Sequence, residues 1–180
     1  MMSILRNDKK RTAYFRKHKV FSNIGQNVHI QTRFIPVYSE LISFHNNIIV
    51  GRKVEFVTHD AIHAVLNGMN IVDYKFKERI GCIEIKDNCF IGAGSMILHG
   101  VMIGENCIIA AGSVVTKDCE SNSVYAGVPA KRICSLDEYI EKRIRSEQQG
   151  RAAYTSHNQQ LTDDEIAEAW LIFQKNHGSN

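Results

Sequence analysis

Residues 85–118 read IKDNCFIGAGSMILHGVMIGENCIIAAGSVVTKD, and this stretch decides the fold. A branched aliphatic residue occupies every sixth position without a slip: Ile85, Ile91, Ile97, Ile103, Ile109 and Val115. Four residues after each of the first five stands a small or branched residue: Cys89, Ser95, Val101, Cys107 and Ser113. An amphipathic helix repeats about every 3.6 residues and a half-buried strand every second residue, so neither keeps this register. The period predicts a mainly β solenoid of stacked coils.

In such a solenoid each hexapeptide supplies one short strand and one tight turn, and three hexapeptides close a triangular coil. The aliphatic positions of successive coils then stack into an interior ladder, which no single coil could bury alone. The same register recurs more weakly upstream, at Ile24, Ile30, Phe44, Val50 and Phe56. It disappears between Phe56 and Ile80, which predicts a loop extruded over residues 58–80. Long loops on a regular scaffold are more often functional than decorative.

Composition and charge place the chain among ordinary globular proteins. It has 180 residues, 44% of them hydrophobic and 23% charged, with a formal net charge of +3. This mild charge indicates no nucleic-acid partner, and no apolar run is long enough to span a bilayer. The N-terminus lacks the apolar core of a signal peptide, so we expect a cytoplasmic protein. The five cysteines are odd in number and form no CxxC pair, which argues against disulfides.

Three regions are predicted: a basic helical cap over 1–20, the coil over 21–134, and a helical extension over 135–180. Residues 7–20 carry six of the 22 Lys and Arg residues and are interpreted as a solvated helix covering the open end of the coil. An anionic polysaccharide or a membrane surface is the alternative partner of this basic run. Ser135 with Glu138, and Thr162 with Glu165, are spaced as capping boxes that begin two C-terminal helices separated by a polar linker.

Two segments carry a family resemblance. AAGSVVTKD at 110–118 followed by AGVPAKRI at 126–133 resembles the end of the repeat in hexapeptide-repeat acetyltransferases, the group of the galactoside, maltose, serine and xenobiotic acetyltransferases. YSELISFHNNIIVGRKVEFVTHD at 38–60 resembles members that acetylate sugars of capsular and other surface polysaccharides. The resemblance covers about residues 20–134. It implies a left-handed parallel β-helix, a homotrimer, and acetyl-CoA bound in the groove between adjacent subunits, so that the active site is shared between them.

The resemblance places the catalytic base at His59, directly after the strand that ends at Phe56-Val57-Thr58. A sugar hydroxyl is almost wholly protonated at neutral pH, and imidazole titrates in the right range to remove its proton as the C–O bond forms. His63 is the competing candidate, and a loop histidine that only fixes the backbone is the structural alternative. Asp60 adjoins His59, but sequence alone does not establish an Asp–His pair. A zinc site would need three suitably placed histidines, and this loop supplies two, so no metal is expected.

Positions matching the CoA-contacting residues of relatives are small or basic: Ala93, Ala111, Thr116, Lys117 and Lys131. The alanines would let the pantetheine arm approach the backbone, and the lysines would meet its phosphates as point charges. Corner geometry and solvated surface charge are the respective structural alternatives.

The acceptor side departs from the family pattern at Tyr38-Ser39, where polysaccharide-type relatives often read Asp-Pro. Tyr38, Ser39 and His63 are the expected acceptor-binding residues, with Tyr38 able to stack on a sugar ring. The sequence therefore predicts an acetyl-CoA-dependent O-acetyltransferase acting on a sugar, with a surface-polysaccharide precursor as the expected acceptor. N-acetylation of an amino sugar and a non-catalytic assembly protein are the alternatives.

Overall fold

A computed structural model of the chain describes residues 7–149 and 160–177. The chain divides into two compact units, Met1–Leu136 and Asp137–Asn180. The first six residues of the predicted N-terminal cap, and most of the predicted polar linker, lie outside the described residues.

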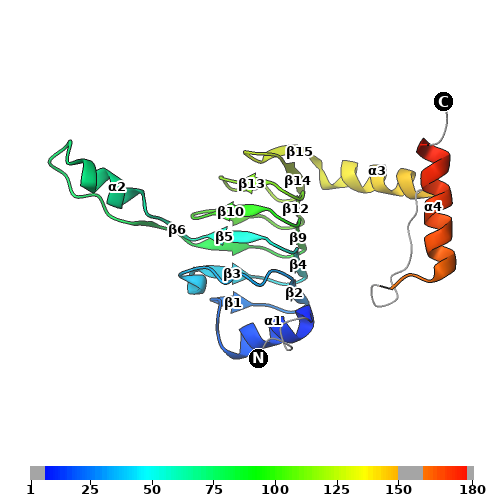
Figure 1. Ribbon diagram of the computed structural model, residues 1–180, viewed down its shortest axis with the longest axis horizontal. Coiled ribbons are helices and arrows are strands. Elements are labelled where there is room, and N and C mark those ends of the chain that lie inside the picture. Colours follow the sequence, from blue (N-terminus) through cyan, green and yellow to red (C-terminus); the bar gives the residue numbers. More distant parts are fainter. Residues whose placement is uncertain (1–6, 150–159, 178–180) are drawn as a thin grey trace. The chain divides into compact units, whose positions relative to one another are not determined.

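The first unit is a coil with three faces of stacked strands, all parallel except β15 at one end (Figure 1). The first face, sheet A, consists of β1 (Asn23–Ile24), β3 (Ile42–Phe44), β8 (Ile83–Ile85) and β11 (Met102–Ile103). Sheet B consists of β2 (Val28–Ile30), β4 (Ile48–Val50), β9 (Cys89–Ile91), β12 (Ile108–Ile109), β14 (Ser123–Ala126) and β15 (Lys131–Ser135). Sheet C consists of β5 (Glu55–Val57), β10 (Met96–Leu98) and β13 (Val114–Val115). The chain visits the three faces in turn, so the architecture is the predicted solenoid of short parallel strands.

The six-residue register is confirmed by burial. All six aliphatic positions from Ile85 to Val115 are 0–1% exposed, and the small positions between them are also buried. The two buried serines of the ladder need partners for their hydroxyls, and each hydroxyl donates to the carbonyl of Ala110, Ser95 at 3.0 Å and Ser113 at 2.7 Å. The upstream ladder continues the same interior, with aromatic residues Phe44 and Phe56 in edge-to-face contact.

One corner of the coil is lined by an asparagine in each of five successive turns: Asn27, Asn47, Asn88, Asn106 and Asn122. All five have φ between 51° and 59°, a left-handed conformation that asparagine tolerates better than other residues with a side chain. Their side-chain amides form a continuous ladder, each Nδ2 donating to the next Oδ1 at 2.6–2.9 Å. The turn therefore satisfies its own polar groups while repeating from coil to coil.

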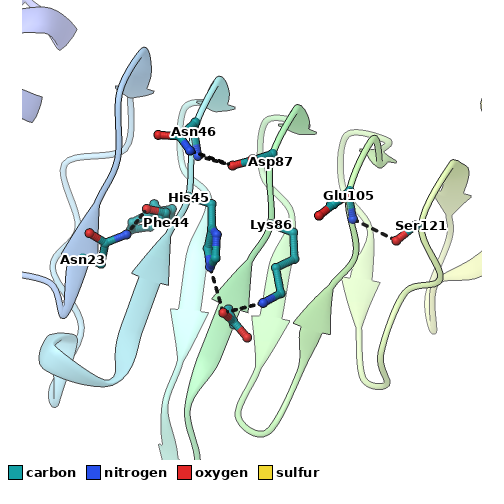
Figure 2. A network of polar contacts seen from close by, with 9 residues as sticks. Asn23, Phe44, His45, Asn46, Lys86, Asp87, Glu105 and Ser121 are labelled. Carbon is teal, nitrogen blue, oxygen red and sulfur yellow. Dashed lines mark hydrogen bonds and ion pairs between the residues drawn. The ribbon is translucent and has the colours of Figure 1, made fainter.

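Polar side chains also connect neighbouring coils on the outside of sheet A (Figure 2). The Glu84 carboxylate accepts hydrogen bonds from His45 Nε2 at 2.8 Å and from Lys86 Nζ at 2.7 Å. At the adjoining corner the Asp87 carboxylate accepts from the backbone N–H of Asn46 at 2.6 Å. The hydrogen bonds to Glu84 lower its pKa, that of Lys86 most.

The first unit is closed at both ends. Helix α1 (Asp8–Lys17) packs on β2, where Phe15 joins the core and the Arg11 guanidinium donates to the carbonyl oxygens of Ile30 at 2.8 Å and Gln31 at 3.1 Å. These carbonyls sit at the open end of the first coil. At the opposite end β15 pairs antiparallel with β14 and covers its free edge.

The extruded segment is more ordered than the predicted loop. It leaves the coil as β6 (His59–Asp60), forms helix α2 (Ile62–Met69), and returns as β7 (Arg79–Ile80), which pairs antiparallel with β6. Figure 1 shows it as an arm projecting from sheet C, with α2 toward its far end. The extruded segment therefore contains a helix, whose apolar residues Ile62, Val65 and Met69 are at helical spacing, and its two ends pair as a ribbon.

The second unit contains the two predicted helices, α3 (Leu136–Gln148) and α4 (Asp163–His177). The capping box that begins α4 is confirmed: Thr162 N–H donates to Glu165 Oε2 at 2.7 Å, and Glu165 N–H donates to Thr162 Oγ1 at 3.2 Å. On α4 the rings of Trp170 and Phe173 meet edge to face and are both exposed.

Candidate active site

His59 lies where the regular coil gives way to the arm. It follows β5 by one residue, Thr58, whose buried hydroxyl donates to the carbonyl oxygen of Val37 at 2.5 Å. This contact fixes the end of β5 against the preceding turn. In β6 the backbone of His59 faces Ile80 across the ribbon, so both ends of the arm are held at this point.

Three side chains from distant parts of the sequence meet here: Tyr38, His59 and Glu78. The Tyr38 ring packs edge to face on the His59 imidazole, with 5.3 Å between the ring centroids. The Tyr38 hydroxyl donates to Glu78 Oε2 at 3.3 Å, and Glu78 Oε1 lies 4.0 Å from His59 Nε2. The side chains of His59 and Glu78 are 32% and 31% exposed, so solvent reaches the group.

The charge of Glu78 acts on its tyrosine neighbour. The carboxylate raises the pKa of Tyr38 above its usual value of 10.0, with desolvation adding to the effect. Tyr38 therefore stays a hydrogen-bond donor throughout the physiological pH range. This residue also adopts a left-handed backbone conformation, with φ 55°, which directs the chain into the short 3₁₀ turn η1 (Ser39–Leu41).

The two loop histidines share one feature. His59 Nδ1 and His63 Nδ1 are both buried and have no hydrogen-bond partner among the described residues. Neutral imidazole carries one proton, on either nitrogen. The tautomer of His59 is therefore not fixed by a hydrogen bond within the described part of the chain.

Asp60 faces a different histidine. Its Oδ2 lies 3.6 Å from His99 Nε2, and its Oδ1 accepts the backbone N–H of Ile62 at 3.1 Å at the start of α2. The carboxylate beside His59 comes instead from Glu78, which sequence reasoning missed. Residues 73–79 contain four charged side chains besides Glu78, and only the pairing of β6 with β7 selects the one that returns to the histidine.

The predicted acceptor-binding residues are only partly brought together. Tyr38 contacts His59, and Ser39 follows it as the first residue of η1. His63 lies in the first turn of α2, out on the arm.

Four of the predicted CoA-binding residues lie at the two ends of sheet C, and the fifth lies in sheet B. Ala93 and Ala111 are exposed at the corner that precedes β10 and β13, where Gly112 N–H donates to the Ala93 carbonyl at 2.9 Å. Thr116 and Lys117 follow β13, at the end of the sheet from which His59 also leaves. Lys131 begins β15, directly after Ala130, whose N–H donates to the Val114 carbonyl at 2.8 Å.

The corner at Ala93 and Ala111 is open beside its two glycines. A Cβ atom built on Gly94 or Gly112, the residues that follow the two alanines, would meet nothing within 4 Å. Strand β10 lies between β5 and β13, so Thr116 is two strand spacings, about 10 Å, from the level of His59. A long, thin molecule could therefore run along this face between the corner and the histidine.

Two other properties concern residues 7–149 and 160–177, the part of the chain that the structure describes. No group of three or more His, Cys, Asp or Glu residues there is placed to hold a metal ion. No helix in these ranges is long and apolar enough to cross a membrane.

Comparison with known proteins supports the repeat assignment. Residues 83–117 match the family of bacterial transferase hexapeptide repeats (six repeats). Protein CapG of Staphylococcus aureus is 42% identical over 108 residues, which are 59% of this chain and 59% of CapG. The galactoside O-acetyltransferase of Lactococcus lactis is 36% identical over 109 residues, 58% of this chain and 51% of the enzyme. The chain thus spans between about half and three fifths of the length of these relatives.

A solved structure gives the same result for the fold. The maltose O-acetyltransferase of Clostridium difficile 630 superimposes with a TM-score of 0.51 at 27% sequence identity, covering 71% of this chain and 83% of that one. Over its coil, the chain therefore resembles the hexapeptide-repeat acetyltransferases, as its sequence predicted.

Proposed function

We propose that the protein is an acetyl-CoA-dependent acetyltransferase that acetylates a sugar hydroxyl, with His59 as the general base. The observation that carries the proposal is the position of His59, whose partly exposed imidazole stands at the end of sheet C beside a carboxylate. The names of its relatives support the reaction class, since two of them are O-acetyltransferases of a galactoside and of maltose. A precursor of a surface polysaccharide is the acceptor that we infer from the sequence resemblance.

The reaction conserves its atoms without a further co-reactant. His59 Nε2 takes the proton of the acceptor hydroxyl while its oxygen forms a bond to the thioester carbonyl carbon. The tetrahedral intermediate collapses, the C–S bond breaks, and the imidazolium returns the proton to the departing CoA sulfur. The products are the acetyl ester and free CoA. Base catalysis at Nε2 requires the other ring proton on Nδ1.

Acetyl-CoA, the donor substrate, would lie along sheet C. The open corner at Ala93 and Ala111 leaves space for the pantetheine arm, and Thr116 lies toward the histidine. Lys117 and Lys131 are exposed and could meet the phosphates as point charges. Each of these assignments can be tested separately by alanine substitution and CoA titration.

We further propose a homotrimer of left-handed coils, with each active site completed by a neighbouring subunit. The arm supports this, because helix α2 exposes apolar side chains in the single chain: Ile62 is 58% exposed, Val65 65% and Met69 54%. Contiguous apolar surface of this kind is uncommon on a monomer and marks interaction sites. Sedimentation at micromolar concentration checks the state of assembly.

Substitution of His59 by alanine tests the mechanism. Loss of a general base should lower the transfer rate by about 10²–10⁴-fold while leaving CoA binding unchanged. The assay follows labelled acetyl-CoA with methyl galactopyranoside, maltose and nucleotide-linked sugars as acceptors, and thermal shift with CoA monitors the donor site.

His63→Ala is the matched control, since it removes the other loop imidazole that has a buried nitrogen. Turnover near that of the wild type in His59→Ala, with loss of activity in His63→Ala, would transfer the role of base to His63. Alkali-stable products would show N-acetylation in place of the proposed ester.

A further inference from the structure

The carboxylate of Glu78 has two oxygen atoms in different situations. Oε2 accepts the hydroxyl of Tyr38 at 3.3 Å, which orients the group. Oε1 faces His59 Nε2 at 4.0 Å. That separation is too long for a direct hydrogen bond, which requires about 2.7–3.2 Å between the heavy atoms.

The separation between His59 Nε2 and Glu78 Oε1 would allow each atom to bind one of two neighbouring polar groups on an acceptor molecule. Adjacent hydroxyls of a sugar ring lie within hydrogen-bond distance of each other, so one can reach Nε2 while the next reaches Oε1. An ionised carboxylate only accepts hydrogen bonds, so it selects a donor, such as a hydroxyl or an ammonium group. The nitrogen atom of the base and the free oxygen atom of Glu78 thus form a two-point contact.

We propose that Glu78 determines acceptor specificity, by binding the hydroxyl or ammonium group next to the hydroxyl that His59 deprotonates. This role rests on the proposed function. It restricts the acceptors to sugars that keep a free donor beside the acetylated position. Because His59 lies in β6 and Glu78 directly precedes β7, its partner strand, the ribbon holds the two contacts near each other.

Tyr38 takes a supporting role in this arrangement. Its hydroxyl holds Oε2 and its ring rests against the imidazole, so it positions both groups that contact the acceptor. Its raised pKa keeps it protonated as a donor to the carboxylate. An acceptor that lacks the neighbouring donor leaves the half-buried carboxylate without its partner, and such mismatches are strongly discriminated against.

The experiment measures acetyl transfer to methyl galactopyranoside and to its monodeoxy analogues by wild-type protein, E78Q and Y38F. A hydrogen bond to a charged group accounts for a factor of about ten to a hundred. E78Q should therefore raise KM for the parent sugar by that factor. The deoxy analogue that lacks the hydroxyl bound by Glu78 should have the same KM with the wild-type protein and with E78Q. Y38F should raise KM for the parent sugar by a smaller factor than E78Q does. D73N, which removes an exposed charge of the same arm, is the matched control and should leave KM unchanged.

Three outcomes would overturn the role of Glu78. If E78Q lowers kcat equally with every acceptor and moves the pH profile of kcat/KM, Glu78 acts on His59 and not on the acceptor. If E78Q changes KM equally for the parent sugar and all deoxy analogues, no neighbouring donor is being recognised. If the wild-type protein transfers no acetyl group and shows no thermal shift with CoA, the proposed function is itself wrong and the role of Glu78 falls with it. CoA binding thus separates the two failures.

Discussion

Substitution of Gly92 by alanine tests how closely the coils stack beside the proposed donor path. Gly92 directly follows the aliphatic ladder residue Ile91 and is buried against the next coil. A Cβ atom built on it would lie 2.4 Å from the backbone N of Ala111 and 2.7 Å from the backbone carbon of Ala110. Because these are backbone atoms, no side-chain rotation relieves the contact. The coils would have to separate by at least 0.6 Å (3.0 − 2.4) to reach even the shortest distance that real Cβ atoms show.

The expected cost is at the upper end of that for overpacking a core, about 3 kcal/mol. With an m-value of about 2–3 kcal/mol per molar urea, the unfolding midpoint should fall by about 1 M. Urea unfolding followed by far-ultraviolet circular dichroism measures this shift.

Gly68→Ala provides the matched control for the same chemical change. Gly68 lies in α2, where an added Cβ would meet nothing within 4 Å, and alanine favours a helix by up to about 1 kcal/mol. Its unfolding midpoint should therefore not fall. A midpoint for Gly92→Ala within about 0.3 M of the wild type, at unchanged m-value, would refute the inference that the coils are packed backbone to backbone at this corner.

Two further predictions concern titration and thiol chemistry. The pKa of Glu84 is lowered in the folded state, first by its hydrogen bond from Lys86 and then by that from His45. The stability that the Glu84 carboxylate contributes is therefore fully present above the pKa of an unfolded glutamate, and it is lost as the pH falls through the lower pKa of the folded state. Glu84→Gln should thus lower the urea midpoint at pH 7 and lose that effect in acid, and a gap that persists or widens below pH 3 would contradict it. Burial raises the pKa of the Cys89 and Cys119 thiols to about 12, so at pH 8 Ellman's reagent should label the exposed Cys82 rapidly and leave both buried thiols unreacted until urea is added. Rapid labelling of either buried thiol in the native protein would show that the interior opens on the timescale of the reaction.

The coil was predictable because its signal is local and periodic. Ile97 and its equivalents occupy the interior of a repeating unit, so spacing alone assigned both their strand and their burial. The corner asparagines follow the same repeat, since the left-handed turn conformation restricts the choice of residue.

The site was only half predictable. His59 was selected by the family resemblance, and its place directly after a strand of the repeat agrees with where the period stops. Glu78 lies 19 residues later, on a segment with no period, and reaches His59 only because β7 pairs with β6. The pairing of β7 with β6 joins residues that are far apart in the sequence, and no periodic pattern in the sequence indicates it. The extruded segment was predicted, but its helix α2 was not, because the apolar spacing covers only two turns.

The closed ends of the coil have a consequence for assembly. A stack of parallel strands ends at two edges, and each edge carries unpaired backbone N–H and C=O groups. These groups would allow one molecule to stack on the next, so that the molecules assemble into a fibre. Here Arg11 of α1 donates hydrogen bonds to two carbonyl oxygens of the first coil. At the last coil, β15 runs antiparallel to β14. Reversing the strand direction leaves the final edge with the wrong hydrogen-bond pattern for another parallel coil. Stacking of a further parallel coil is therefore disfavoured at both ends, which favours association of copies of this unit through their flanks.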